Sequence, residues 1–243
     1  MKNAFDPFEE YPPFDGFPKQ GIEFLKKLKR NNNRSWFERH KPEYESSVKF
    51  PMQCLLASLR PDFARIASEY EIHPKRSIFR VYRDTRFSKD KTPYKTHVAA
   101  HAVLRGQPKG FVGSGYYIHV EPGECFVGGG IYMPDSTQLK KIRKAVSAHA
   151  TEFLGIVQRR TFVRRFGSIE GERLKRIPRG FDETDRTAEW LKLKQFFVGV
   201  SLPEASCYRP EFVSEVAAIC ESATPLVRFL NAALSGGERL VQI

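Results

Sequence analysis

The chain has 243 residues, of which 41% are hydrophobic and 28% are charged, the size and composition of one soluble domain. It carries 40 Lys and Arg against 28 Asp and Glu, a formal net charge of +12, and this surplus favours anionic partners. The four scattered cysteines, Cys54, Cys125, Cys207 and Cys220, form no C-x-x-C pair, which argues against a zinc finger or a disulfide framework.

The N-terminal part of the chain is expected to be helical after an irregular start. Residues 1–15 are rich in proline, acidic and aromatic residues without a period, so we predict a loose arm, followed by a single domain over residues 16–243. A short helix is expected from Phe17 to the run of three asparagines, of which Asn33 can cap the next helix.

Apolar residues then recur at steps of three and four from Trp36 to Ile66, which predicts a helix with one buried face. Pro51 should kink or split it.

The middle of the chain changes to the pattern of strands. Four segments are rich in Val, Ile, Tyr and Phe, namely Ser77–Tyr82, Thr96–Leu104, Tyr116–Glu121 and Cys125–Met133. Pro122 and Gly123 separate the last two, so we predict a hairpin. A tight hairpin places on its core face Tyr116, Ile118, Val120, Cys125, Val127 and Ile131, and on its other face Tyr117, His119, Glu121, Glu124 and Phe126.

Helical patterns return after the hairpin. Asp135 or Ser136 can cap a helix that continues past residue 150, Gln195–Leu202 resembles a further strand, and Glu211–Leu234 has the pattern of a closing helix. Helices, then several strands, then helices again predict an α+β protein with a mainly antiparallel central sheet.

Residues 80–97 read R-V-Y-R-D-T-R-F-S-K-D-K-T-P-Y-K-T-H, with six basic residues against two aspartates. Pro93 argues against one continuous helix, so much of the segment should be loop. Loops lined with Arg, Lys and hydroxyl groups suit phosphate or carboxylate, because Arg offers two parallel donors and Lys a point charge. The plain alternative is a solvated hairpin with weak surface ion pairs.

The chain resembles the bacterial and fungal family called domain of unknown function 2461. The resemblance runs from about Phe14 to Leu234 and rests on N-N-N-R-S-W-F-E-R-H-K-P-E-Y, R-D-T-R-F-S-K-D-K-T-P-Y-K-T-H, G-Y-Y-I-H-V-E-P-G-E, G-G-G-I-Y-M-P and L-K-R-I-P-R-G-F-D. It implies one full-length domain and transfers no catalytic role. The signature residues that it implies are Arg83, Asp84, Arg86, Phe87, Ser88, Lys89, Asp90, Lys91, Pro93, Tyr94 and Lys95.

The candidate site is therefore an anion site without assigned catalytic residues. Its members are Arg83, Asp84, Arg86, Ser88, Lys89, Lys91, Tyr94, Lys95, His97, Tyr117, His119, Arg176 and Arg179. Asp84 would orient the arginines beside it. Arg176 and Arg179 join the site only if their loop, pinned by neighbouring apolar residues, meets the segment at residues 80–97.

A metal site is not predicted from the histidines. On a strand His97 and His101 would stand roughly 13 Å apart, too far to share one ion, although His119 could approach either of them from a neighbouring strand. Gly128-Gly129-Gly130 matches no nucleotide-binding fingerprint, and no Ser-His-Asp order is apparent, so no cofactor is predicted. Glu121 and Glu124 flank the turn and are expected to be solvated.

The leading functional hypothesis is a basic cleft that binds an anionic, phosphate-bearing ligand. A nucleic-acid-binding module is the first alternative, although no helix-turn-helix or RNP motif supports it. A module that docks an acidic protein partner is the second. The sequence shows no secretory signal and no stretch of the roughly 20 apolar residues that a membrane helix needs, so we expect a cytoplasmic protein that does not contact membranes.

Overall fold

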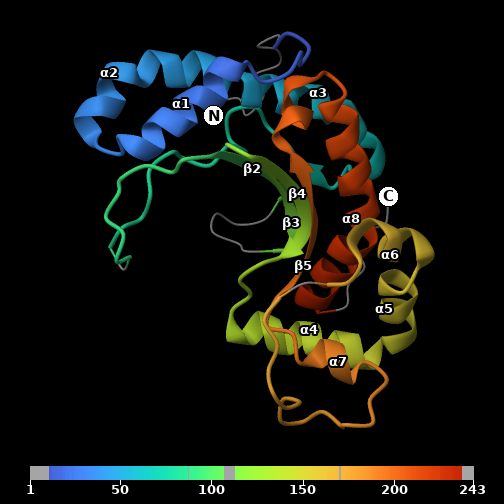
Figure 1. Cartoon of the computed structure of the whole chain (residues 1–243). Coiled ribbons are helices and arrows are strands. Elements are labelled where there is room, and N and C mark those ends of the chain that lie inside the picture. Colours follow the sequence, from blue (N-terminus) through green and yellow to red (C-terminus); the bar gives the residue numbers. More distant parts are fainter. Residues whose placement is uncertain (1–10, 87, 107–112, 170, 237–243) are drawn as a thin grey trace, which may run out of the picture.

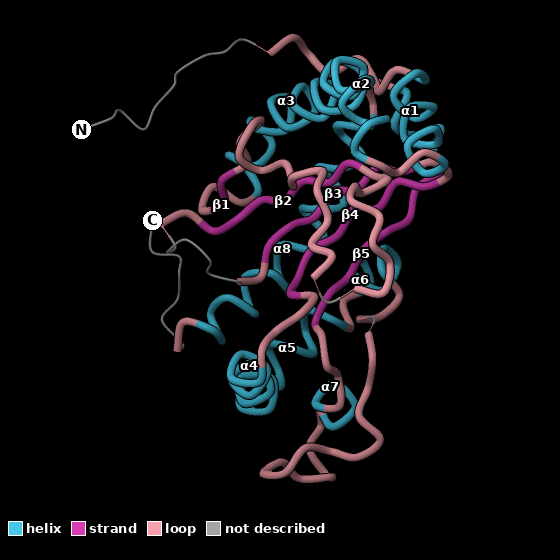
Figure 2. Tube along the Cα trace, turned by 90° about the vertical axis from the view of Figure 1, so that its left-hand side faces the viewer, coloured by secondary structure: helices cyan, strands magenta, loops and turns pink. Residues whose placement is uncertain are grey.

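The computed structural model describes residues 11–86, 88–106, 113–169 and 171–236. It shows an α+β protein in which helices precede and follow a five-stranded sheet, as the sequence predicted (Figure 1). Helices cover one face of this curved sheet, which we call the packed face (Figures 1 and 2). None of the described helices lies across the opposite face, which we call the open face.

The N-terminal helices are α1 (Lys19–Arg30), α2 (Arg34–Tyr44) and α3 (Phe50–Ile66). Asn33 caps α2 as expected, because its side-chain oxygen accepts a hydrogen bond from the backbone N–H of Trp36 at 3.0 Å. A π-helical turn (Glu45–Lys49) joins α2 to α3 just before Pro51. Because proline has no N–H to donate, the regular α-helical hydrogen bonding is interrupted near this residue, as the sequence predicted.

The sheet is antiparallel throughout, and its strands lie in chain order. They are β1 (Tyr70–Glu71), β2 (Val98–Leu104), β3 (Gly115–Glu121), β4 (Glu124–Ile131) and β5 (Phe196–Pro203). The predicted strand Ser77–Tyr82 is wrong, because the segment makes only isolated bridges from Ile78 to Ala100 and from Tyr82 to Tyr94. It follows β2 for a few residues and then leaves the sheet.

The predicted hairpin and its two faces are confirmed. Val120 pairs with Cys125 and Ile118 pairs with Val127, which sets the register of β3 against β4. Residues 116, 118, 120, 125, 127 and 131 are all buried on the packed face, whereas Tyr117, His119 and Phe126 are half-buried on the open face. A one-residue slip would have exchanged these two sets.

The remaining helices are α4 (Ser136–Ala148), α5 (Ala150–Val157), α6 (Arg160–Phe166), α7 (Ala188–Leu191) and α8 (Phe212–Leu234), with a 3-10 turn at Glu204–Tyr208. Asp135 forms a capping box with Gln138 at the start of α4. Long α8 crosses the packed face (Figure 1). A Cβ at Gly129 would lie 2.9 Å from Val227 and 3.0 Å from Ala223, so the glycine permits this close approach.

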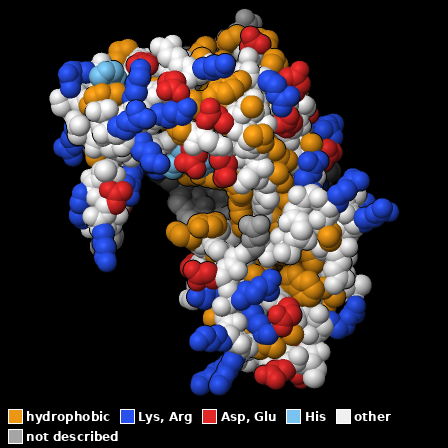
Figure 3. Space-filling view, in the orientation of Figure 1, with side chains coloured by type: hydrophobic (Ala, Val, Ile, Leu, Met, Phe, Trp, Pro, Cys, Tyr) orange, Lys and Arg blue, Asp and Glu red, His pale blue; other side chains and the backbone are white. Residues whose placement is uncertain are grey.

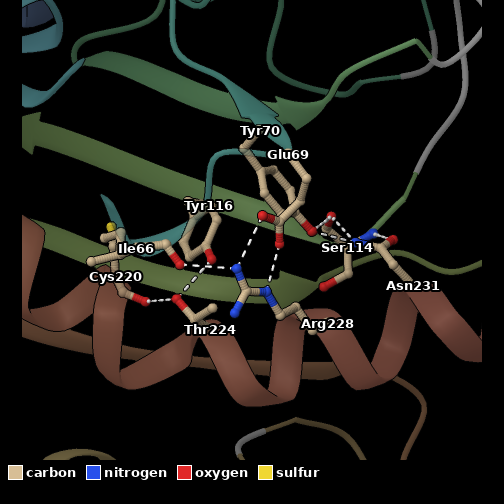
Figure 4. A network of polar contacts seen from close by, with 9 residues as sticks. All are labelled: Ile66, Glu69, Tyr70, Ser114, Tyr116, Cys220, Thr224, Arg228 and Asn231. Carbon is tan, nitrogen blue, oxygen red and sulfur yellow. Dashed lines mark hydrogen bonds and ion pairs between the residues drawn. The ribbon is translucent and has the colours of Figure 1, made fainter. Parts of the chain in front are cut away.

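Polar side chains join α8 to the packed face (Figure 4). The Asn231 side chain accepts from the Ser114 N–H at 3.0 Å, donates to the Ser114 carbonyl at 2.9 Å and contacts the Tyr70 hydroxyl. Tyr116 and Thr224 share a hydrogen bond of 2.9 Å, and the Arg228 guanidinium donates twice to the Glu69 carboxylate, at 2.6 and 3.0 Å.

The core reaches into the segment predicted to be a loose arm. Residues 1–10 of that segment lie outside the described residues, but Phe14 is buried against Phe17 and Phe212. All four cysteines are free and buried, in keeping with packing roles. None of the helices in the described parts of the chain combines the length and the apolar character needed to cross a bilayer.

Candidate binding site on the open sheet face

Aromatic rings form a row across the open face. Consecutive ring centroids lie 6.0 Å apart from Phe79 to Tyr117, 6.5 Å from Tyr117 to Phe126, and 5.9 Å from Phe126 to Phe197. Tyr132, whose side chain is exposed, continues the row at 6.0 Å from Phe197. The Phe126 ring occupies the space that a Cβ at Gly199 would need, so this glycine lets the ring lie against the sheet.

Two histidines, a tyrosine and a glutamate meet at one end of β3. The rings of His97 and His119 stack with centroids 4.3 Å apart, and the Tyr117 hydroxyl is hydrogen-bonded to His119 Nδ1 at 2.9 Å. Glu121 Oε1 lies 3.5 Å from His119 Nε2. The β2–β3 register explains the cluster, because Val98 pairs with Val120 and so brings His97 beside the end of β3.

Burial keeps the two histidines and the tyrosine of this cluster neutral. It lowers the pKa of His97 to about 4, helped by the neighbouring His119 and Lys95, and it also lowers the pKa of His119. Burial raises the pKa of Tyr117 to about 12. Both imidazoles are therefore uncharged at neutral pH and have a nitrogen lone pair to offer. His101 lies outside this cluster and packs its ring edge-to-face with Phe79.

Residues 80–95, which we call the basic loop, project from the body beside the open face (Figures 1 and 2). The loop is held at its root by hydrogen bonds from the Arg83 N–H to the Pro93 carbonyl and from the Lys95 N–H to the Val81 carbonyl. Tyr94 is buried there and stacks on the ring of Phe37 at 4.1 Å. Tyr94 therefore anchors the loop instead of lining the site.

Asn32, in the turn between α1 and α2, strengthens this anchor. Its side chain donates to the Tyr94 carbonyl at 2.9 Å and accepts from the Tyr94 N–H at 3.0 Å. The basic loop is thus fastened to the turn between α1 and α2.

Several cations of the basic loop are paired within it. Arg83 bonds Asp90 and the Thr92 hydroxyl, and Arg86 makes a two-point contact with Asp84 at 2.7 and 3.0 Å. These arginines hold the pKa of each aspartate at about 2.

The other loop members differ in exposure. Lys91 donates to the Thr85 carbonyl at 2.9 Å, Lys89 is exposed, and Ser88 is half-buried. Phe87, a signature residue of the resemblance, lies outside the described residues. Figure 3 shows Lys and Arg side chains along the loop and a hollow between the loop and the body.

Lys95 differs from the other loop cations that lack an ion pair, Arg80, Lys89 and Lys91, because it is half-buried whereas they are exposed. Its Nζ lies 5.1 Å from the centre of the half-buried Phe79 ring, and no carboxylate of the described chain lies within ion-pair distance of it. Burial lowers the pKa of Lys95, and the nearby positive charge of Arg80 lowers it further. Lys95 also acts electrostatically on His97, so it connects the basic loop to the histidine cluster.

Arg176 and Arg179 do not join this group. Both are exposed and lie in the segment between α6 and α7, which runs beyond the sheet and away from the basic loop in both ribbon views (Figures 1 and 2). The structure instead adds Phe79, Arg80 and Glu121, which the sequence hypothesis left out of the site. The alternation of residues along β3, which already placed Glu121 on the face of Tyr117 and His119, could have identified the last of these.

Comparisons with known proteins agree with the resemblance noted from the sequence. The model of the conserved hypothetical proteins DUF2461 matches residues 20–229, a span that includes the basic loop, the sheet and most of α8. No curated protein and no solved structure matches the chain. The chain belongs to the conserved hypothetical protein family DUF2461.

Proposed function

We propose that the open face beside the basic loop binds an anionic, phosphate-bearing ligand. The proposal rests mainly on the environment of Lys95. Its ammonium group is partly buried beside a second cation, Arg80, and no carboxylate among the described residues is in ion-pair contact with it. A charge removed from water and left unpaired is costly, and two like charges side by side add to that cost. An anion placed between Lys95 and Arg80 relieves both penalties.

The two arginines that are paired with aspartates have a structural role in the loop. Arg83 and Arg86 are neutralised by their aspartates, so they shape the loop more than they attract a ligand. The segment from residue 80 to 97 still holds six basic residues against two acidic ones, so its field remains positive. This field would draw anions into the hollow between the loop and the body (Figure 3).

The row of aromatic rings favours a ligand that carries a flat group beside its anion. Phe79 lies directly under Lys95, and Tyr117 and Phe126 extend the row across the sheet. Rings of this kind also stack on the bases of single-stranded nucleic acid. A nucleotide or an aryl phosphate is therefore the first candidate, and a short single strand is the second.

The test is equilibrium binding of inorganic phosphate, nucleotides and a short single-stranded oligonucleotide, measured by calorimetry and by thermal shift. Lys95→Met keeps the apolar stem over Phe79 and removes the charge. Its matched control is Lys144→Met, which removes one exposed charge from α4. We expect one ligand class to bind the wild type and the control, and binding to Lys95→Met to be at least tenfold weaker.

Equal binding to the two lysine variants, or no binding of any phosphate-bearing compound, would overturn the proposal. Binding of the oligonucleotide alone, with affinity that falls steeply as salt is raised, would favour the nucleic-acid role instead.

A further inference from the structure

His97, His119 and Glu121 bring three potential metal ligands together on the open face. Each offers one ligand atom, and these atoms all lie within 4.8 Å of one another. His97 directly precedes β2, and His119 and Glu121 lie at the end of β3; five residue pairs set the register of these two strands. The cluster therefore stands on rigid backbone, which is the support that a binding site requires.

His119 has one ring nitrogen in use and one without a partner. Tyr117 occupies Nδ1 at 2.9 Å, whereas Nε2 is buried and has no hydrogen-bond partner in the described part of the chain. The Glu121 oxygen 3.5 Å away is too distant for a proper hydrogen bond. Leaving a buried polar atom unpaired costs free energy, so the arrangement calls for a group between Nε2 and the carboxylate.

We propose that His97, His119 and Glu121 bind one divalent transition-metal ion. Two imidazole nitrogens and one carboxylate oxygen suit zinc and similar ions, and three protein ligands leave a coordination position for water or another ligand. Tyr117 would act as a positioning residue, because its hydroxyl fixes the orientation of the His119 ring. This site does not depend on the anion-binding role proposed above.

Metal binding requires a modest rearrangement of the cluster. Ligands at about 2.0–2.1 Å from a tetrahedral zinc stand roughly 3.3 Å from one another, closer than the 4.8 Å that bounds the present spacing. The His97 and His119 rings stack at 4.3 Å, so one ring must rotate about its side-chain bonds for both lone pairs to converge. Both residues are only half-buried, so the core does not enclose either ring on all sides.

The experiment titrates the metal-free full chain with Zn²⁺ alone by calorimetry, and with Co²⁺ by visible absorption. The variants are His97→Gln, His119→Gln and Glu121→Gln. The control is His101→Gln, which alters a half-buried histidine of β2 on the same face but outside the cluster. Circular dichroism and the melting temperature of each metal-free variant show whether it is folded.

We expect one Zn²⁺ per chain for the wild type and for His101→Gln, and binding at least tenfold weaker for each of the three cluster variants. Saturating Zn²⁺ should raise the melting temperature of the wild type by about 5–10 °C at 100 times its dissociation constant. Tyr117→Phe should keep the stoichiometry but weaken Zn²⁺ binding and change the Co²⁺ spectrum.

Two results would overturn the site. One is the absence of Zn²⁺ binding to the folded wild type. The other is binding that the three cluster substitutions leave unchanged, because the ion would then sit adventitiously elsewhere on the surface.

Discussion

The two faces of the sheet carry similar residue types and use them differently. On the packed face, Tyr70 and the backbone of Ser114 pair with Asn231 of α8, and Tyr116 pairs with Thr224 of α8. The Ser114 hydroxyl is a buried polar atom there with no partner among the described residues. On the open face, the Tyr117 hydroxyl is hydrogen-bonded to His119 Nδ1, and the second nitrogen of that ring is unpaired within the described chain. Most polar groups of the packed face are paired with α8, whereas the open face has an unpaired imidazole nitrogen on His119 and, beside it, the Lys95 ammonium group without a carboxylate partner in the described chain.

This difference separates residues that stabilise the fold from residues that can bind. Substitutions on the packed face should lower stability and leave ligand and metal binding intact in whatever remains folded. Substitutions on the open face should do the reverse. The first two predictions below test this division, and a third concerns ion pairs made by α8; they run from the largest effect to the smallest.

Asn231→Leu should destabilise the protein by about 3 kcal/mol, because it strands the Ser114 N–H, the Ser114 carbonyl and the Tyr70 hydroxyl in the interior. Urea unfolding followed by circular dichroism measures the change. Thr224→Val is the milder companion, since it removes one partner of Tyr116 at nearly constant volume and should cost about 1 kcal/mol. A smaller loss for Asn231→Leu than for Thr224→Val would contradict the central place of Asn231.

A methyl group added to the packed face should lower the free energy of unfolding more than one added to the open face. Gly129→Ala forces the new Cβ against Val227 and Ala223 of α8, and we expect a loss of about 2 kcal/mol. In Gly199→Ala the nearest atoms to the new Cβ belong to the Phe126 ring, the far end of a half-buried side chain that can rotate toward solvent, so the loss should be below about 1 kcal/mol. Chemical unfolding of the two variants side by side decides the comparison, and equal losses would show that the open face is as tightly packed as the other.

The ion pair between Glu69 and Arg228 should add a small pH-dependent stability. Burial tends to raise the pKa of Glu69, but hydrogen bonds from Arg228 and the backbone, with the Arg228 charge, bring it below its ordinary value of 4.5. The unfolded chain therefore takes up the proton first as pH falls. The stabilisation is complete well above pH 4.5 and disappears as the pH drops through the lowered pKa.

Glu69→Gln should therefore cost about 1 kcal/mol at pH 7 and progressively less below pH 4.5, measured by urea unfolding at each pH. Glu221→Gln is the matched control, because it breaks the more exposed pair between Arg65 of α3 and Glu221 of α8, and it should lower stability less than Glu69→Gln does at pH 7. A Glu69→Gln loss that stays constant down to pH 3 would contradict the assignment.

Local patterns in the sequence were sufficient for most of the elements. Helical spacing, the Asn33 and Asp135 caps and the turn at Pro122-Gly123 act between residues close in the chain, so they predicted the helices and the β3–β4 hairpin with its faces. The strand prediction for Ser77–Tyr82 was wrong, because composition shows which residues favour a strand but not where the chain turns away from its partner strand. This segment leaves β2 after a few residues to enter the basic loop.

The candidate site was likewise predictable only in part from the sequence. Composition alone marked residues 80–97 as a concentration of positive charge, and alternation along β3 placed Tyr117, His119 and Glu121 on one face. The pairs that neutralise Arg83 and Arg86 form within the loop, between residues two to seven positions apart. The role of Tyr94 as an anchor and the course of the α6–α7 segment away from the loop depend instead on contacts between distant parts of the chain. Residue spacing cannot encode those contacts, because packing of the sheet against the helices decides them. The tertiary structure therefore decided that His97 meets His119 and that Lys95 is left without a carboxylate.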